Sequence, residues 1–335
     1  MLTGPATKLL YSVAGRVVLI NAYDAWSLSA VTQVFSGWFL QPLSNQATNE
    51  IDITLSVRCG VTPPPIPVDL TTFEITHGGI CFTDNDTYYI TFGRSLIMFG
   101  PGRSPTVNLW VDQPYEVPSE IGTQLISHAL SPALRRANVF EIHSAGVIAP
   151  NRSDAVMLAG PSGSGKSTLT SQLARVGWGY LSDDILLLTE SEHRIEAQAF
   201  RRFFALTANT MAATRLQSTN ILSRQVKERV TPENHFKGSP VQAARVETII
   251  FPQIGDAGKS ELKQLTAVES MQRLLRLCPW ASYDKPTSGD HLRVMGLLAN
   301  TTSAFALIAG ADVLIDPSAL AELLSSATEE LAYKS

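Results

Sequence analysis

A glycine-rich run followed by a lysine and a serine is the part of this sequence that points most directly to chemistry. Residues 160–167 read GPSGSGKS and satisfy the pattern G-x-x-x-x-G-K-[S/T] at every position. Glycines in such a loop let backbone N–H groups turn toward anionic oxygens, and the N-terminus of the following helix adds the positive end of a dipole. We therefore expect nucleotide phosphates to bind at Gly160, Pro161, Ser162, Gly163, Ser164, Gly165, Lys166, Ser167 and Thr168.

The segments around this loop favour the same interpretation. The apolar run AVMLAG comes directly before it, and an amphipathic pattern from about Lys166 to Val176 predicts a helix after it. In that context the lysine side chain reaches the β and γ phosphates, and the Ser167 hydroxyl coordinates Mg²⁺. The expected cofactors are ATP and Mg²⁺, although no motif that reads the base is recognisable and ATP is not distinguished from GTP.

Two adjacent carboxylates follow one helix later. Asp183 lies 17 residues after Lys166, at the end of the run GYLSDD. We expect this run to form a strand beside the strand before the loop, with its C-terminal end at the phosphates. Carboxylates there can hold Mg²⁺ or accept a proton from an attacking hydroxyl. The alternative is that Asp183 and Asp184 merely end a strand.

Other classes of phosphate-binding protein lack support in the sequence. Transport ATPases share the string GPSGSGKST, but they need an LSGGQ-like signature and a distant apolar run that ends in Asp-Glu, and neither occurs here. The NKxD-type motif with which GTPases read the base is also missing. The acidic strand comes too early in the chain for most motor ATPases.

The segments HSAGVIAP, GPSGSGKST and YLSDD, in this order and spacing, resemble the catalytic domain of HPr kinase/phosphorylase and its relatives. The same core looks like a distant version of that of ATP-dependent phosphoenolpyruvate carboxykinase. The resemblance covers residues 138–200 well and the C-terminal part more loosely. It implies an α/β fold, with an HPr kinase-like P-loop kinase domain and a mixed sheet over residues 126–335. Residues 1–125 carry no motif of the family, and we expect them to form a smaller α+β domain.

The resemblance also implies roles for individual residues. The family transfers a phosphate of ATP to a serine hydroxyl on a protein, so one aspartate is expected to be the general base and the other to help hold the metal. We assign Asp183 as the base and Asp184, with Ser167, to the metal. His143 lies where the family has its strand histidine, near the phosphates. A lone histidine at a strand start can equally be a residue that is only satisfied by hydrogen bonds.

One stretch departs from the family. Where the family carries a segment of LEIRGLG type, associated with the phosphorylase reaction and Mg²⁺ binding, this chain reads RIEAQAFRRFFALT. Glu196 is the candidate to replace the missing acid, and Arg201 or Arg202 is the candidate to hold the transferring phosphate, of which we take Arg202 for the catalytic set. Reverse phosphorolysis and recognition of HPr are therefore open. The chain looks more like HPr-kinase-related enzymes of biosynthetic gene clusters, some of which phosphorylate a serine of a precursor peptide.

Composition limits the partners. The 335 residues are 44% hydrophobic with a net charge of −4, which gives no reason to expect nucleic acid. Scattered cysteines, the lack of a signal-peptide pattern and the lack of a membrane-spanning apolar run predict a cytoplasmic protein without a membrane partner. Residues 201–246 stand apart with eight Lys or Arg against two acids. That stretch is either a solvated face or a lid or substrate-binding surface.

Taken together, the sequence predicts an ATP- and Mg²⁺-dependent kinase, a phosphotransferase acting on a serine-type hydroxyl. The acceptor is expected to be a peptide or protein, such as a biosynthetic precursor peptide, rather than a small molecule. A small-molecule kinase for a sugar or amino-acid hydroxyl and a non-catalytic nucleotide-binding regulator are the alternatives. Residues 1–125, whose β-rich part (73–112) predicts an antiparallel meander, are expected to serve recognition or assembly. The resemblance also makes a homo-oligomer possible.

Overall fold

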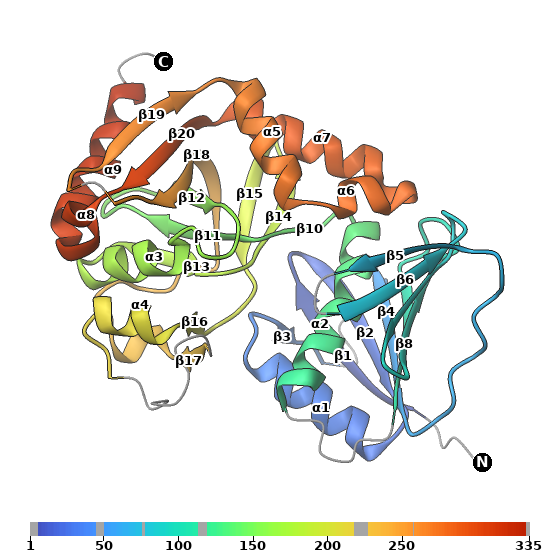
Figure 1. The fold of residues 1–335 in the computed structure, drawn as a ribbon. Coiled ribbons are helices and arrows are strands. Elements are labelled where there is room, and N and C mark those ends of the chain that lie inside the picture. The colour runs from blue at the N-terminus through green and yellow to red at the C-terminus, as the bar shows by residue number, and fades with distance from the viewer. Residues whose placement is uncertain are drawn as a thin grey trace. The chain divides into compact units, whose positions relative to one another are not determined.

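The computed structural model describes residues 6–44, 50–75, 78–112, 119–217, 227–256 and 258–332. The chain divides into two compact units (Figure 1). Unit 1 comprises Met1–Phe140 and Trp280–His291, and unit 2 comprises Glu141–Pro279 and Leu292–Ser335. The boundary therefore differs from the expected one at 125/126, and unit 1 also takes a short segment from much later in the chain.

Unit 1 is built on a nine-stranded mixed sheet with the order β3-β1-β2-β4-β9-β8-β7-β6-β5. Strands β2, β4 and β9 run parallel, and β5 to β9 form the predicted antiparallel meander. The strands are β1 (Thr7–Val13), β2 (Arg16–Ala22), β3 (Gln41–Pro42), β4 (Ile53–Cys59), β5 (Thr71–Ile75), β6 (Gly79–Thr83), β7 (Tyr88–Phe92), β8 (Ser95–Phe99) and β9 (Thr106–Val111).

Two helices pack on this sheet and on each other, α1 (Ala25–Ser36) and α2 (Ser119–Arg136). Helix α1 begins at Asp24, whose carboxylate accepts a hydrogen bond from the Ser27 amide and so satisfies a free N–H of the first turn. The sequence predicts the second helix from Val117, a residue outside the described ranges. Because α2 packs against β4 and β9, all of it belongs to unit 1, whereas the expected boundary at 125/126 would have divided it.

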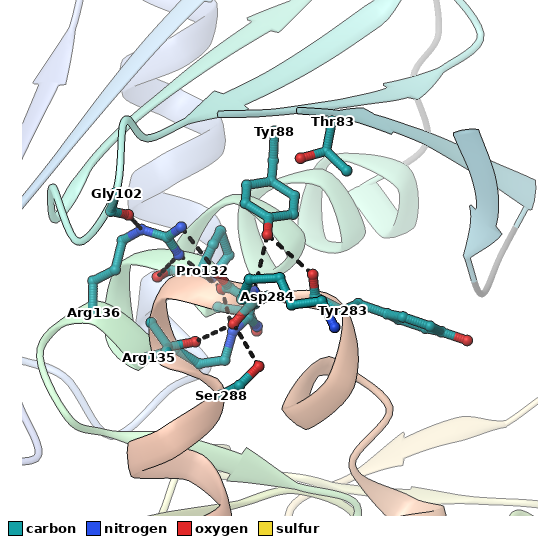
Figure 2. A network of polar contacts seen from close by, with 12 residues as sticks. Thr83, Tyr88, Gly102, Pro132, Arg135, Arg136, Tyr283, Asp284 and Ser288 are labelled. Carbon is teal, nitrogen blue, oxygen red and sulfur yellow. Dashed lines mark hydrogen bonds and ion pairs between the residues drawn. The ribbon is translucent and has the colours of Figure 1, made fainter. Parts of the chain in front are cut away.

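A buried ion-pair network anchors residues 280–291 in unit 1 (Figure 2). This segment holds α6 (Trp280–Tyr283) and the start of α7 (Lys285–Thr301). Between them Asp284, with no exposed surface, pairs with Arg135 at 3.0 Å and with Arg136 at 2.8 Å, both on α2. Tyr88 on β7 adds two hydrogen bonds, since its hydroxyl accepts from the Lys285 amide and donates to the Tyr283 carbonyl. Charges this deep are tolerated only when they are paired, so the late segment is part of this core.

Unit 2 is a second mixed α/β layer structure. Its main sheet has the order β10-β14-β15-β18-β12-β11-β13, and β20 and β19 continue from β18. The strands are β10 (Phe140–Ile142), β11 (Ser144–Ile148), β12 (Ala155–Ala159), β13 (Gly179–Ser182), β14 (Leu186–Ser191), β15 (Arg194–Ala199), β18 (Ala243–Ile254), β19 (Glu261–Leu265) and β20 (Ser303–Ala309). A separate pair consists of β16 (Phe204–Leu206) and β17 (Glu228–Val230).

The helices of unit 2 cover these strands. Helix α3 packs on β11 and against α9, and α5 packs on β20. Apolar side chains of β11, β12, α3 and β20, among them Val147, Leu158, Leu169 and Leu307, form the core beneath the glycine loop. The helices are α3 (Lys166–Arg175), α4 (Ala208–Ala213), α5 (Ala267–Leu277), the rest of α7, α8 (Ala311–Ile315) and α9 (Pro317–Ala332). No helix in the described parts of the chain combines the length and hydropathy that crossing a bilayer requires.

One predicted strand pairing in unit 2 is wrong. Strands β11 and β12 form an antiparallel hairpin, as do β14 and β15. Strand β13 does not lie beside β12, as the sequence led us to expect, because it pairs with β11. Both β12 and β13 run antiparallel to β11, so they run in the same direction. The C-terminal end of β13 therefore still lies at the edge of the sheet where the glycine loop begins.

Candidate active site

The glycine loop lies between β12 and α3, where the sequence predicts it. Gly165 is the N-cap of α3 and has a φ of 99°, and Gly163 has a φ of 83°. Both values are in the left-handed region, which side chains with a Cβ adopt at a cost. The two glycines thus let the chain turn sharply into a helix whose first N–H groups have no partner within the helix.

Lys166, the first residue of α3, turns its side chain back over the loop. Its Nζ donates hydrogen bonds to the carbonyl oxygens of Gly160 at 2.6 Å and Pro161 at 2.9 Å. The side chain is almost fully buried, and burial lowers the pKa of Lys166 to about 8. A lysine ammonium held at the mouth of such a loop is a positive charge in position for an anion.

The two aspartates after β13 have different surroundings. Asp183 is 1% exposed, and its Oδ2 accepts a hydrogen bond from the Ala205 amide at 3.1 Å. Its Oδ1 finds no hydrogen-bond partner among the described residues. The backbone carbonyl of Asp183 accepts a hydrogen bond from the Ser167 hydroxyl at 3.3 Å, so this residue lies directly behind the start of α3. Burial, with the charge of Asp184, raises the pKa of Asp183 to about 6.

Asp184 instead faces three nitrogen-bearing side chains. Its carboxylate pairs with Nη1 of Arg201 at 2.8 Å and with Nζ of Lys227 at 3.8 Å. The third neighbour is Nδ1 of His143, at 3.3 Å. Burial alone would raise the pKa of Asp184, but Lys227, Arg201 and His143 together lower it below its usual range. The carboxylate is therefore ionised at neutral pH.

His143 lies between β10 and β11 and reaches the same carboxylate. Burial lowers its pKa to about 4, and the nearby ammonium of Lys166 acts in the same direction, against the effect of Asp184. The imidazole is thus neutral at pH 7, and a neutral ring donates from only one of its two nitrogens. The expected position of His143 near the phosphate loop agrees with the geometry.

These groups line one cavity of about 490 Å³ in unit 2. Its walls include the loop residues Ser162, Gly163, Gly165, Lys166, Ser167 and Thr168. Asp184 and His143 line it as well, whereas Asp183 is not among the lining residues. A volume of this size lies within the range of small-molecule binding sites.

Several lining residues were not predicted from the sequence. They are Lys227, the apolar residues Ile254 and Leu314, and members of the segment that crosses from β16 into α4, namely Ala205, Thr207, Asn209, Thr210 and Ala213. Thr210 is hydrogen-bonded to Thr168 at 2.9 Å, which ties α4 to the loop. The excess of basic residues in 201–246 was the one signal for Lys227. Arg224, in the same run, lies outside the described residues.

Two sequence assignments do not match the geometry. Arg202 is exposed and is not among the lining residues, while its neighbour Arg201 makes the ion pair with Asp184. Arg201 is not a lining residue either, and it is linked to the cavity through its ion pair with Asp184. Glu196 lies on β15 and accepts a hydrogen bond from Gln198 at 2.8 Å, away from the cavity lining.

Few protein groups are positioned to hold a metal ion. The described residues contain no group of three or more His, Cys, Asp or Glu side chains arranged as a metal site. Mg²⁺ often binds through one or two protein oxygens together with phosphates and water. The Ser167 hydroxyl and the unpartnered Oδ1 of Asp183 fit that mode, because both are oxygen donors next to the loop.

Comparisons with known proteins found a likeness at the level of structure. Among solved structures, the chain is similar to the HPr(Ser) kinase/phosphatase from Coxiella burnetii, at 11% identity over 57% of this chain and 98% of that chain, with a TM-score of 0.34. No protein-family model matches the sequence, and no curated protein matches it. At this identity and TM-score the likeness carries no argument about activity, so the functional proposal below rests on the geometry of the site.

Proposed function

We propose that the protein is an ATP- and Mg²⁺-dependent kinase that transfers the γ-phosphate to a serine-type hydroxyl on a peptide or protein. The observation that supports this most directly is that the glycine loop and the ionised carboxylate of Asp184 line the same cavity. Phosphoryl transfer requires mainly positioning and charge neutralisation. A phosphate-binding loop that faces a carboxylate across one cavity provides both.

The triphosphate is held by the backbone amides of residues 160–168 and by Lys166. Ser167 and Asp183 would hold Mg²⁺, which would neutralise charge that develops on the phosphates. This exchanges the two aspartate roles expected from the sequence, because Asp183 is buried behind Ser167 and does not line the cavity. Its raised pKa also fits a carboxyl group whose charge lacks a partner in the free protein.

Asp184 receives the acceptor. It accepts the hydrogen bond of the incoming hydroxyl, orients the oxygen toward the phosphate and takes its proton as the new bond forms. Arg201 and His143 fix the carboxylate in position through the contacts described above. Lys227 is close enough to the same carboxylate to neutralise charge on the phosphate in transit.

The test is transfer from γ-³²P-ATP with Mg²⁺ to two sets of acceptors, pooled serine-containing peptides and a panel of sugars and hydroxy amino acids. We expect label on peptides, and none with Lys166→Ala. Label on small hydroxyl compounds alone would instead identify a small-molecule kinase. Nucleotide binding without any acceptor-dependent label would leave a non-catalytic regulator and contradict the proposal.

A further inference from the structure

Gln172 lies in the middle of α3 and connects this helix to two others. Its side chain is fully buried. Its Nε2 donates hydrogen bonds to the carbonyl oxygens of Leu314 at 2.7 Å and of Ala213 at 3.3 Å. Its Oε1 accepts a hydrogen bond from Nη1 of Arg175 at 2.6 Å. Because carbonyl oxygens only accept and a guanidinium group only donates, the amide fits these partners in one orientation.

The two carbonyl groups belong to separate parts of the cavity wall. Ala213 is the last residue of α4 and Leu314 lies in α8, and both residues line the cavity of the candidate active site. Both helices contact α3 (Figure 1). Because one nitrogen atom binds both carbonyls, Gln172 fixes how far apart these two parts of the wall lie.

A second contact relates this link to the phosphate loop. Thr168, the last residue of the loop, lies one turn before Gln172 on the same face of α3. Its hydroxyl is hydrogen-bonded to that of Thr210 in α4 at 2.9 Å. Helix α4 therefore follows α3 from the loop to Gln172. Thr168, Thr210 and Ala213 all line the cavity, which thus extends from the phosphate loop along α3.

Three residues that line this cavity are apolar, namely Ala213, Ile254 and Leu314. Ile254 lies at the end of β18, where its side chain meets Gly165 of the loop. It is 40% exposed, so covering it with an apolar group would be favourable. A nucleoside triphosphate carries such a group, because a planar base follows the charged phosphates. Since the loop binds the phosphates in the proposed function, the base is the part of the ligand that can cover these side chains.

We propose that Gln172 is a positioning residue for the nucleoside part of ATP, and that it acts by holding Ala213 and Leu314 at the separation at which they contact the base. This rests on the proposed function, in which the loop binds a triphosphate, and adds how the rest of the nucleotide is recognised. The loop itself would bind phosphates with or without a nucleoside attached. Inorganic tripolyphosphate, which has the phosphates and no base, is therefore the ligand that separates the two contributions.

The experiment compares ATP with tripolyphosphate. Calorimetry with Mg²⁺ measures the affinity of each variant for both ligands, and γ-³²P-ATP measures transfer to serine-containing peptides on the same preparations. Gln172→Met keeps the length of the side chain and removes its hydrogen bonds. The matched control is Gln198→Met on β15, because the Gln198 amide contacts Glu196 outside the cavity lining.

A second pair of variants keeps the test decisive if Gln172→Met does not fold. Ala213→Gln places a bulkier, polar side chain at an exposed position of α4 that lines the cavity. Its control is Ala212→Gln, the same change at the neighbouring exposed position, which does not line the cavity.

We expect the wild type to bind ATP more tightly than tripolyphosphate. Gln172→Met and Ala213→Gln should each weaken ATP binding about five- to twentyfold and change tripolyphosphate affinity less than about twofold, and both controls should behave as the wild type. An equal loss for the two ligands would mean that Gln172 only stabilises unit 2, and it would overturn the inference. Equal wild-type affinities for ATP and tripolyphosphate, or no binding of either, would overturn it as well.

The two proposals fail in different ways. A selective loss of ATP binding without any transfer of label in the wild type would uphold the role of Gln172 and contradict the kinase proposal. Transfer of label by the wild type, with no selective loss in either variant, would do the reverse.

Discussion

At the scale of single residues, the site depends on backbone conformation as much as on side-chain charge. Gly165 takes a left-handed conformation at the first turn of α3, and a Cβ there would come within 2.5 Å of Ile254. The amides that follow are aimed by this turn. Replacing Gly165 should therefore weaken anion binding more than it destabilises the fold.

We expect Gly165→Ala to lower nucleotide affinity at least tenfold and to destabilise unit 2 by about 1–2 kcal/mol, because alanine is strained at this φ. Titration calorimetry with ATP and Mg²⁺ gives the affinity, and thermal unfolding gives the stability. The control is Gly296→Ala in α7, where a Cβ meets no atom within 4 Å and φ is not positive. That change should stabilise the helix by up to about 1 kcal/mol. Unchanged affinity in Gly165→Ala would contradict the role of the loop.

At the scale of elements, the junction between α6 and α7 is held by charge rather than by apolar packing alone. Asp284 accepts from two buried arginines of α2 (Figure 2). Removing the carboxylate charge would leave two guanidinium groups under-compensated in the core of unit 1. The loss of a buried pair lowers the free energy of unfolding more than the loss of an ion pair at the surface.

Asp284→Asn should accordingly destabilise unit 1 by about 3–5 kcal/mol, measured by urea unfolding followed through tryptophan fluorescence. Asp290→Asn is the matched control. Asp290 also pairs with an arginine, Arg103, but that arginine is half exposed, so its loss should cost no more than about 1 kcal/mol. Equal effects of the two changes would show that burial of the ion pair is not what holds the segment.

His291 gives the same element a dependence on pH. It is 2% exposed, stacks on Phe140 at 4.7 Å and has no hydrogen-bond partner on either ring nitrogen among the described residues. Burial, and then the charge of Arg135, lowers its pKa to about 4, while Asp284 acts in the opposite direction. The unfolded chain, with an ordinary pKa near 6.5, binds the proton more readily than the folded one.

The contribution of the neutral His291 to the free energy of unfolding is therefore fully present above pH 6.5, and it is lost as the pH falls from 6.5 toward 4. The loss should reach about 3 kcal/mol by pH 4. Urea unfolding at a series of pH values measures it, and His291→Phe should remove that part of the slope. If the variant keeps the wild-type slope over this range, the titrating group is another one.

At the scale of the whole molecule, the structural features that could be predicted from the sequence are those that depend on residues close together in the chain. The glycine loop between a strand and a helix is such a local pattern, and it is present where the sequence predicts it. The partner of β13 was missed because the order of strands in a sheet depends on contacts between distant segments. Lys227 was not singled out for the site because it lies 43 positions after Asp184 and no motif marks it.

The division of the chain was missed for the same reason. The pairing of Arg135 and Arg136 with Asp284 joins residues almost 150 positions apart, and no periodic pattern in the sequence predicts it. A fragment of residues 1–140 would keep both arginines and lose their carboxylate. We expect that fragment to show no cooperative urea unfolding by circular dichroism, in contrast to the full chain. A sharp transition in the isolated fragment would mean that unit 1 does not need its late segment.

The central claim is that the glycine loop and Asp184 act on one nucleotide, and Asp184→Asn tests it most directly. In this variant we predict that turnover with a peptide that the wild-type protein phosphorylates falls about 10²–10⁴-fold. The dissociation constant for ATP with Mg²⁺ should change less than threefold. Rates from γ-³²P-ATP and affinities from calorimetry on the same preparation give both quantities. Full turnover in Asp184→Asn would contradict the claim.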